Sequence, residues 1–359
     1  MRSWYLFGAL AGVMLFSGCR NELPLATAEQ MDLVDAIRNP RRSDFQTVLA
    51  QNTDLHFVDR LGKTPLVHAV EMGDAEKIRA LVMQGADPAM PDGKGFTALH
   101  RAASMENADS LRVLLSLPGV TPDVVSVQGK TPLMEAARLG LVDNVKLLLE
   151  KGADIRKADE QERTVLMFAA MAPKHSLALV KLLLEKEADR LLYDTNGNTV
   201  LFHAINAKNT ETACYLLDTL HDFDQNDLHA LIGFMAMKHA VYAGDGDVVR
   251  KIIAKKLPLN SDVSLIYKSL KAVNVEGIYK LMARNHIIPD GKTPLFWAAE
   301  ADQPEMVEIL VDAGANPNGR DNASNSPVEY ARKRETVQAL RKAARDWKKM
   351  QAAKEAKGK

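Results

Sequence analysis

Cysteine is almost absent from this chain, which has two, Cys19 and Cys214, in 359 residues. One intramolecular disulfide at most is possible, so a disulfide-stapled scaffold is excluded and the fold depends on side-chain packing. If Cys19 is modified, Cys214 is left alone in an apolar helical stretch, where we interpret it as a core residue. The hydrophobic content of 47% is enough to build a core without a crosslink.

Sequence patterns that carry catalysis or bind metals are also missing. We find no nucleophile elbow, Ser-His-Asp pattern or P-loop, and glycine-containing pieces such as 194–198 are turn sequences. His68, His203 and His239 share one register position, but no second pair of ligands has metal spacing. The sequence therefore predicts no enzyme, no cofactor and no metal site.

The N-terminus lacks an apolar run long enough to span a bilayer. The thirteen-residue run Trp4 to Phe16 follows Arg2 and ends at Phe16-Ser17-Gly18-Cys19. This ending resembles the lipobox of bacterial lipoproteins, which implies cleavage before Cys19 and lipidation of Cys19; an ordinary secretory signal with a chance cysteine is the alternative. The resemblance predicts a lipid-anchored protein of the bacterial envelope, and Arg20 favours the outer membrane, facing the periplasm.

A repeated unit fills most of the remaining chain. In 129–159, Thr131 is placed as a helix N-cap with Pro132 behind it, Gly140 interrupts the apolar pattern, and Gly152 occupies a C-cap position. Equivalent head residues recur at steps of 33, 34, 33 and 35 residues, then after a gap of 94, then after 33: Thr64, Thr97, Thr131, Thr164, Thr199, Thr293 and Ser326.

The period, the Thr-Pro-Leu heads and the Gly-Ala-Asp or Gly-Ala-Asn tails resemble those of the ankyrin-repeat family. The resemblance implies an all-α solenoid of helix–turn–helix units with β-turn fingers, in which His100 ties adjacent turns. We expect a signal peptide at 1–18, a lipidated tether at 19–27, an ankyrin domain at 28–346 and a basic tail at 347–359. Two degenerate repeats near 230–288, aligned from Met235 and Ser264, are expected to fill the gap, and 31–49 a degenerate capping repeat.

Charge is divided unevenly along a chain whose formal net charge is zero. Residues 332–359 hold eleven Lys and Arg against three Asp and Glu, so the preceding repeats are acidic. We interpret the tail as a solubilising helix; contact with anionic headgroups or nucleic acid is the alternative. An extracytoplasmic location and the scarcity of aromatic residues beside Trp347 argue against nucleic acid.

Ankyrin proteins recognise partners through their fingers and the concave side of the first helix of each unit. The position before each head residue is mostly basic, which suits an acidic partner surface, although solvation of turns explains it as well. The position eight after the head is apolar in consecutive repeats, at Met72, Met105 and Leu139, and we interpret it as an exposed patch; a register error of one residue would put it in the core. The candidate partner-binding residues are Lys63, Met72, Phe96, Met105, Lys130, Arg138, Leu139, Arg163, Met171 and Tyr193.

The function predicted from these features is a lipid-anchored periplasmic scaffold or adaptor that binds a protein partner through its concave face. An immunity protein that neutralises a secreted antibacterial toxin, such as a lipase or wall hydrolase, is the alternative. A secreted effector aimed at a host is disfavoured by the Cys19 signal.

Overall fold

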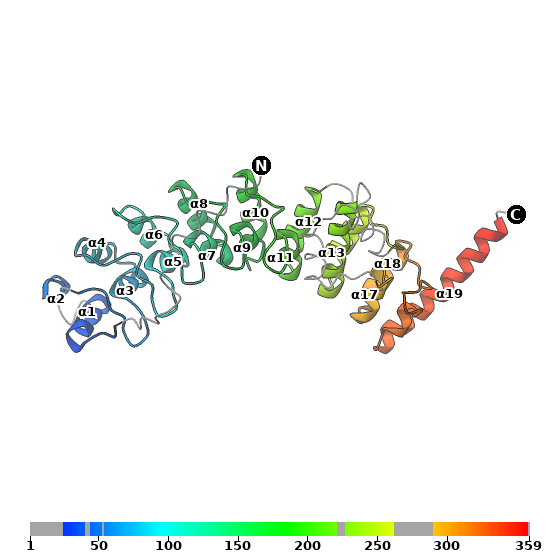
Figure 1. Ribbon diagram of the computed structural model, residues 1–359, viewed down its shortest axis with the longest axis horizontal. Coiled ribbons are helices and arrows are strands. Elements are labelled where there is room, and N and C mark those ends of the chain that lie inside the picture. The colour runs from blue at the N-terminus through cyan, green and yellow to red at the C-terminus, as the bar shows by residue number, and fades with distance from the viewer. Residues whose placement is uncertain (1–23, 40–43, 52–53, 221–226, 262–289, 358–359) are drawn as a thin grey trace. The chain divides into compact units, whose positions relative to one another are not determined.

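The computed structural model describes residues 24–39, 44–51, 54–220, 227–261 and 290–357, without the side chains of 227–230 and 354–357 (Figure 1). The chain divides into two compact units, Met1–Val127 and Gln128–Lys359, called unit 1 and unit 2 below. The described elements of both are helices joined by turns, which confirms the all-α repeat architecture.

Unit 1 is built from helix pairs in which the first helices form one row. Helix α1 packs against α3 and α3 against α5, while α4 packs against α6 in a second row. The helices are α1 (Ala28–Arg38), α2 (Phe45–Gln51), α3 (Pro65–Met72), α4 (Ala75–Met83), α5 (Ala98–Ala103) and α6 (Asp109–Leu114).

Unit 2 continues the same pattern with longer rows. The inner row runs α7, α9, α11, α13, α17, and the outer row contains α10, α12, α14, α18 and α19, each packed on the next. The bounds are α7 (Pro132–Leu139), α8 (Val142–Glu150), α9 (Val165–Ala170), α10 (Ser176–Glu185), α11 (Val200–Asn206), α12 (Thr210–Asp218), α13 (Asp227–Ala243), α14 (Gly246–Ala254), α17 (Pro294–Glu300), α18 (Pro304–Asp312), η1 (Pro327–Glu329) and α19 (Arg334–Lys357).

Short-range sequence signals place the ends of these helices. Thr131 caps α7 by accepting a hydrogen bond from the backbone N–H of Met134, and Pro132 occupies the first helical position. Gly140 and Gly152 have φ of +77° and +85°, the left-handed conformation that glycine adopts at low cost. The boundaries predicted for this unit are therefore confirmed.

The degenerate region is only partly described. Ala240 and Val249 are fully buried and Gly244 has a positive φ, as the alignment from Met235 predicts, but α13 begins earlier, at Asp227. The unit expected from Ser264 lies outside the described residues. Among the described helices, α13 packs directly on α17 and α14 on α18.

The first and the last described helices are α1 and α19. Helix α1 opens with a reciprocal capping box between Thr27 and Gln30, and α3 covers its apolar face. At the other end α19 is a single helix of 24 residues that runs through the boundary predicted between residues 346 and 347. The core between the rows consists mainly of small and aliphatic side chains with fully buried phenylalanines, among them Phe168, Phe202 and Phe296.

Candidate partner-binding surface

The apolar position eight after each head residue lies at the surface in the first three full repeats. Met72, at the end of α3, is 53% exposed, and Met105 and Leu139 are half-buried. None of the three belongs to the core, so the predicted register is consistent with the structure. In the next repeat Ala172 is fully buried, and Ala207 is exposed again.

Each of these side chains lies at, or just after, the C-terminal end of an inner helix, because the core-facing positions of that helix lie one turn earlier. In α7 the residues from Leu133 to Ala137 are buried, and the first exposed residue after them is Arg138. In unit 1, Met72 lies on α3 and Met105 lies in the turn after α5. Helices α3 and α5 pack together. Unit 2 presents Arg138, Leu139 and the half-buried Met171.

The basic position before each head is paired with carboxylates of its own repeat. Lys63 Nζ lies 2.6 Å from Glu71 Oε2, and Lys130 Nζ lies 3.4 Å from Glu135 Oε1. Glu135 is buried and also binds Arg138, whose Nη2 is 2.8 Å from Oε2. Much of the positive charge on this column is thus balanced within the repeat, which reduces its long-range attraction for an acidic partner.

Arg163 shows the same pairing with a second contact. Its guanidinium donates to Asp159 Oδ2 from Nε at 2.9 Å and from Nη2 at 2.7 Å, and it lies over the ring of Phe168. A planar guanidinium that donates two hydrogen bonds to one carboxylate and lies over an aromatic face is fixed in direction. Arg163 therefore acts first as a structural tie between finger and helix.

The two aromatic anchors differ in accessibility. Phe96 is half-buried, with the Arg101 guanidinium 5.0 Å from its ring centroid, whereas Tyr193 is 49% exposed. Leu191 and Leu192 beside Tyr193 are also exposed, at 62% and 43%. We call these three residues the Leu191–Tyr193 patch; the sequence reasoning singled out only its tyrosine, although three large apolar residues in a row before a finger were a usable signal.

Buried aspartates close the fingers, and sequence reasoning missed them. Asp59 Oδ1 accepts backbone hydrogen bonds from Leu61 and Lys63 at 2.8 Å, while its Oδ2 lies 2.9 Å from His68 Nε2. The same arrangement, with an aspartate five residues before the head, recurs with varying side-chain partners at Asp92, Asp159, Asp194 and Asp321. The signal was available, because the aspartate recurs at the repeat period.

These aspartates explain the histidine layer. His203 pairs with Asp194 at 3.0 Å as His68 does with Asp59, and His239 instead lies 3.0 Å from Asn206 Oδ1 and stacks on Phe202. Burial, together with the nearby cations Lys63 and Arg38, lowers the pKa of His68 below its ordinary value, although Asp59 acts in the opposite direction. In the described part of the chain no group of three or more His, Cys, Asp or Glu residues could hold a metal ion.

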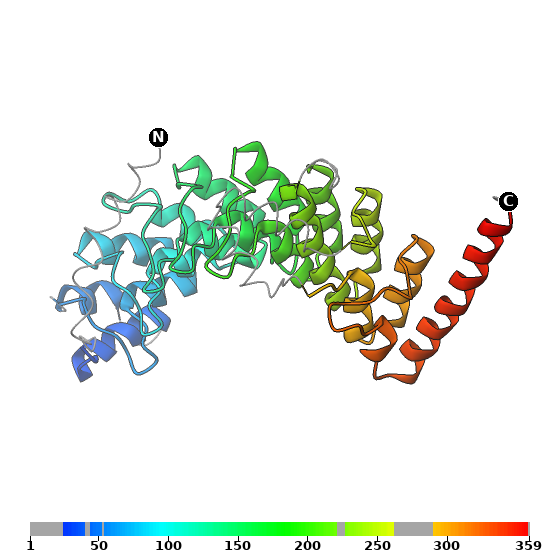
Figure 2. The ribbon, with the colours of Figure 1, turned by 45° about the vertical axis from the view of Figure 1, so that its right-hand side comes forward.

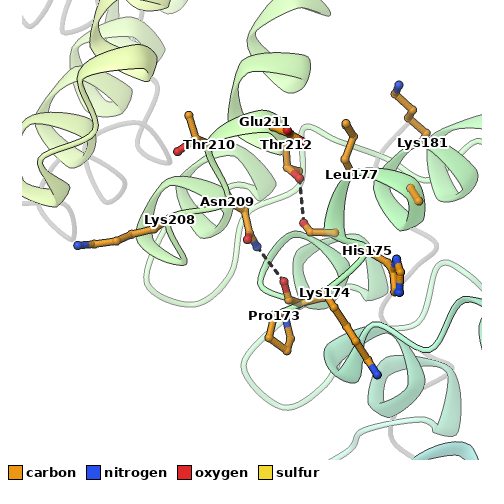
Figure 3. Close-up of a pocket in the computed structure, with 13 residues that line it drawn as sticks. Pro173, Lys174, His175, Leu177, Lys181, Lys208, Asn209, Thr210, Glu211 and Thr212 are labelled. Carbon is orange, nitrogen blue, oxygen red and sulfur yellow. Dashed lines mark hydrogen bonds between the residues drawn. The ribbon is translucent and has the colours of Figure 1, made fainter. Parts of the chain in front are cut away.

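A hollow of about 640 Å³ lies in unit 2 where the loops before α10 and α12 meet. Asn209 Nδ2 donates to the carbonyl oxygen of Ala172 at 3.0 Å, and Thr212 donates to Ser176 at 3.0 Å (Figure 3). Lys174 and Lys208 point away from each other in Figure 3, so their charges do not converge on one point. The hydrogen bonds of Asn209 and Thr212 thus join neighbouring repeats across this hollow.

The remaining candidate groups carry little chemistry. Cys214 in α12 is a free thiol that is half-buried rather than in the core, and burial raises its pKa, which lowers its reactivity. Among the described helices, none combines the length and the apolar character that a bilayer crossing requires.

Family models identify the chain. The model described as ankyrin repeats (3 copies) matches residues 33–126 and 166–265, and the single ankyrin-repeat model matches 128–160 and 290–322. The chain belongs to the ankyrin-repeat family, whose fold is a scaffold for protein–protein interaction and is generally non-enzymatic.

Curated relatives match part of the chain. The chain is 33% identical over 129 residues to neurogenic locus notch homolog protein 1 of Xenopus tropicalis, covering 36% of this chain and 5% of that protein. It is 35% identical over 126 residues to the putative ankyrin repeat protein FPV014 of fowlpox virus, covering 34% and 29%. Mitochondrial disaggregase of Bos taurus is 29% identical over 164 residues, covering 43% and 24%. The chain thus matches less than a third of the length of these relatives.

Among solved structures, the ankyrin repeat protein EF0377 is 29% identical to this chain with a TM-score of 0.45, covering 50% of this chain and 94% of that one.

Proposed function

We propose that this chain is a lipid-anchored adaptor of the bacterial envelope, facing the periplasm, that binds a folded protein partner with the inner-helix ends and fingers of its repeats. The observation that supports it best is the outward position of Met72, Met105 and Leu139 in a fold whose family uses that position for recognition. Methionine adapts its shape to a partner, and apolar side chains at a surface stabilise a complex when they are buried.

The binding surface is tested by charge substitution. We expect Met105→Glu with Leu139→Glu to weaken partner binding by about 2 kcal/mol or more, because each carboxylate would be desolvated in the complex. The matched control is Met83→Glu, since Met83 is 75% exposed at the end of the outer helix α4. Binding is measured by affinity capture of residues 20–359, using the producer's envelope proteins and its exported proteins as separate sources.

The outcomes separate the roles. A partner from the envelope, lost with the double variant and kept with Met83→Glu, supports the adaptor. A hydrolase from the exported pool that is inhibited on binding supports an immunity protein. Capture unaffected by the double variant contradicts this surface, and a double variant that loses its helical circular dichroism shows that the two residues support the core.

The anchor is tested separately at Cys19. We expect Cys19→Ser to move the protein from the membrane to the soluble fraction of the envelope, because the buried acyl chains provide the membrane affinity. Fractionation followed by immunoblotting measures the change, with Cys214→Ser as the control. Unchanged membrane association of Cys19→Ser would rule out lipidation there as the anchor.

A further inference from the structure

The last helix extends well past the helix on which it packs. The backbone N–H groups of Arg332 and Lys333 both donate to Asp302 Oδ1 at 2.8 Å, which holds the start of α19 beside the start of α18. Helix α18 has 9 residues and α19 has 24, so the end of α19 continues beyond α18 by about 20 Å. Figure 2 shows this end of α19, in red.

Among the described residues of α19, the buried side chains lie in its first part. Thr336 and Leu340 are buried, and α19 packs against α18 and η1. Beyond Leu340 the side chains are exposed or half-buried through residue 353. We call residues 341–357 the overhang of α19.

Charge and apolar groups separate on the overhang. Its exposed cations Arg341, Lys342, Arg345, Lys348 and Lys349 fall within an arc of about 120° at 100° per residue, with Asp346 at one edge. The other side carries Ala343, Ala344, the half-buried Trp347 and Met350, which is 42% exposed. This side prolongs the line on which Leu340 packs, so the helix is amphipathic as far as Met350.

We propose that the overhang of α19 lies on an anionic phospholipid surface, with Trp347 and Met350 at the boundary between headgroups and acyl chains. A basic amphipathic helix lies in the plane of such an interface, where tryptophan is favoured and each nearby Lys or Arg is attracted by the negative surface potential. One tryptophan and one methionine make a small apolar face for docking into a protein groove, whereas five clustered cations suit a charged surface.

The location of this contact rests on the proposed envelope anchor, because an acyl chain at Cys19 would hold the chain beside phospholipid. The contact itself is measured without the anchor. We would use the mature chain, residues 19–359, with Cys19→Ser, so that no acyl chain contributes. If Cys19→Ser left membrane association unchanged, the proposed envelope anchor would be wrong. The lipid affinity of α19 could still be measured.

The experiment is sedimentation with two kinds of vesicle, one of phosphatidylcholine alone and one with about a third phosphatidylglycerol. We expect the protein to bind the anionic vesicles about ten-fold or more tightly than the neutral ones, and added salt to weaken this binding. Reversing three overhang cations, Arg345→Glu, Lys348→Glu and Lys349→Glu, should remove the preference. The matched control reverses Lys146, Lys151 and Lys186 to Glu, three exposed cations of unit 2 outside α19.

Tryptophan fluorescence gives a second readout. Trp297 is 6% exposed in α17, so a Trp297→Phe background leaves Trp347 as the tryptophan of the mature chain. Anionic vesicles should shift Trp347 emission to shorter wavelength. The proposal is overturned by equal binding to both vesicle types, by an unshifted Trp347, or by equal losses in the overhang and control variants. The proposal is also overturned if the overhang binds neither type of vesicle and binds an acidic protein instead.

Discussion

Single residues decide how closely successive repeats approach each other. Gly140 and Gly152 both end helices of the same repeat in the left-handed conformation. A Cβ at Gly140 would lie 2.2 Å from the carbonyl oxygen of Lys174 in the following repeat, whereas a Cβ at Gly152 would meet nothing within 4 Å. The loop carrying Lys174 therefore packs directly on the backbone at Gly140.

This difference predicts unequal costs for the same substitution. Gly152→Ala should lower the free energy of unfolding by about 1 kcal/mol, the cost of a left-handed alanine. Gly140→Ala adds a backbone collision to that cost and should lower it by about 3 kcal/mol. Urea unfolding monitored by circular dichroism measures both, and equal losses would show that the loop at Lys174 moves aside freely.

At the scale of elements, each finger is tied to the helix that follows it. Asp59 closes its turn with Oδ1 and binds His68 of α3 with Oδ2. Burial alone would raise the pKa of Asp59, but hydrogen bonds from Lys63 and His68 bring it below its ordinary value. Burial lowers the pKa of His68, beside the cations Lys63 and Arg38.

Both shifts make unit 1 less stable in acid. As the pH falls below 6.5, the ordinary pKa of histidine, His68 is protonated in the unfolded chain before it is protonated in the folded chain, so the free energy of unfolding decreases. Protonation of Asp59 decreases the free energy of unfolding in the same way at lower pH. We expect the melting temperature of unit 1 to fall between pH 7.5 and 5.5, and His68→Gln to reduce that fall. His56→Gln is the control, because the side chain of His56 is 54% exposed. An unchanged fall in the His68 variant would contradict this account.

At the scale of the molecule, the chain forms two compact units that meet in sequence between Val127 and Gln128. Repeat arrays are stabilised mainly by contacts between neighbouring repeats, so a long array does not always unfold in one step. The tryptophans lie at positions 4, 297 and 347, and the proposed signal cleavage removes the first. Fluorescence of the mature chain would then report on unit 2 alone.

The two units can be separated by comparing probes. Circular dichroism records helices of both units, so we expect its urea transition to be broader than the fluorescence transition and centred differently. Leu66 in unit 1 is 2% exposed, so Leu66→Ala should destabilise this unit by about 3 kcal/mol. The urea transition recorded by circular dichroism should then shift to lower urea concentration, while the midpoint recorded by fluorescence should not change. Coincident transitions in both proteins would show a single cooperative unit.

The sequence by itself determined the architecture, because an ankyrin unit is encoded locally. Thr131 and Pro132 start α7, Gly140 and Gly152 follow the ends of α7 and α8, and the apolar period selects the buried faces. Repetition at a nearly constant step then multiplies each local signal, so even the divergent unit with Ala240 and Gly244 could be aligned. The surface position of Met72, Met105 and Leu139 followed from the same register.

Only the tertiary structure decided which side chains meet across turns and between repeats. The pairing of Asp59 with His68 spans nine residues around a turn, and the packing of Lys174 on Gly140 depends on how two repeats stack. The sequence showed the basic column, but not that Glu71 and Glu135 balance its lysines. These contacts depend on how a turn folds back onto its helix and how neighbouring repeats stack, whereas the helices themselves depend on neighbours three and four residues away.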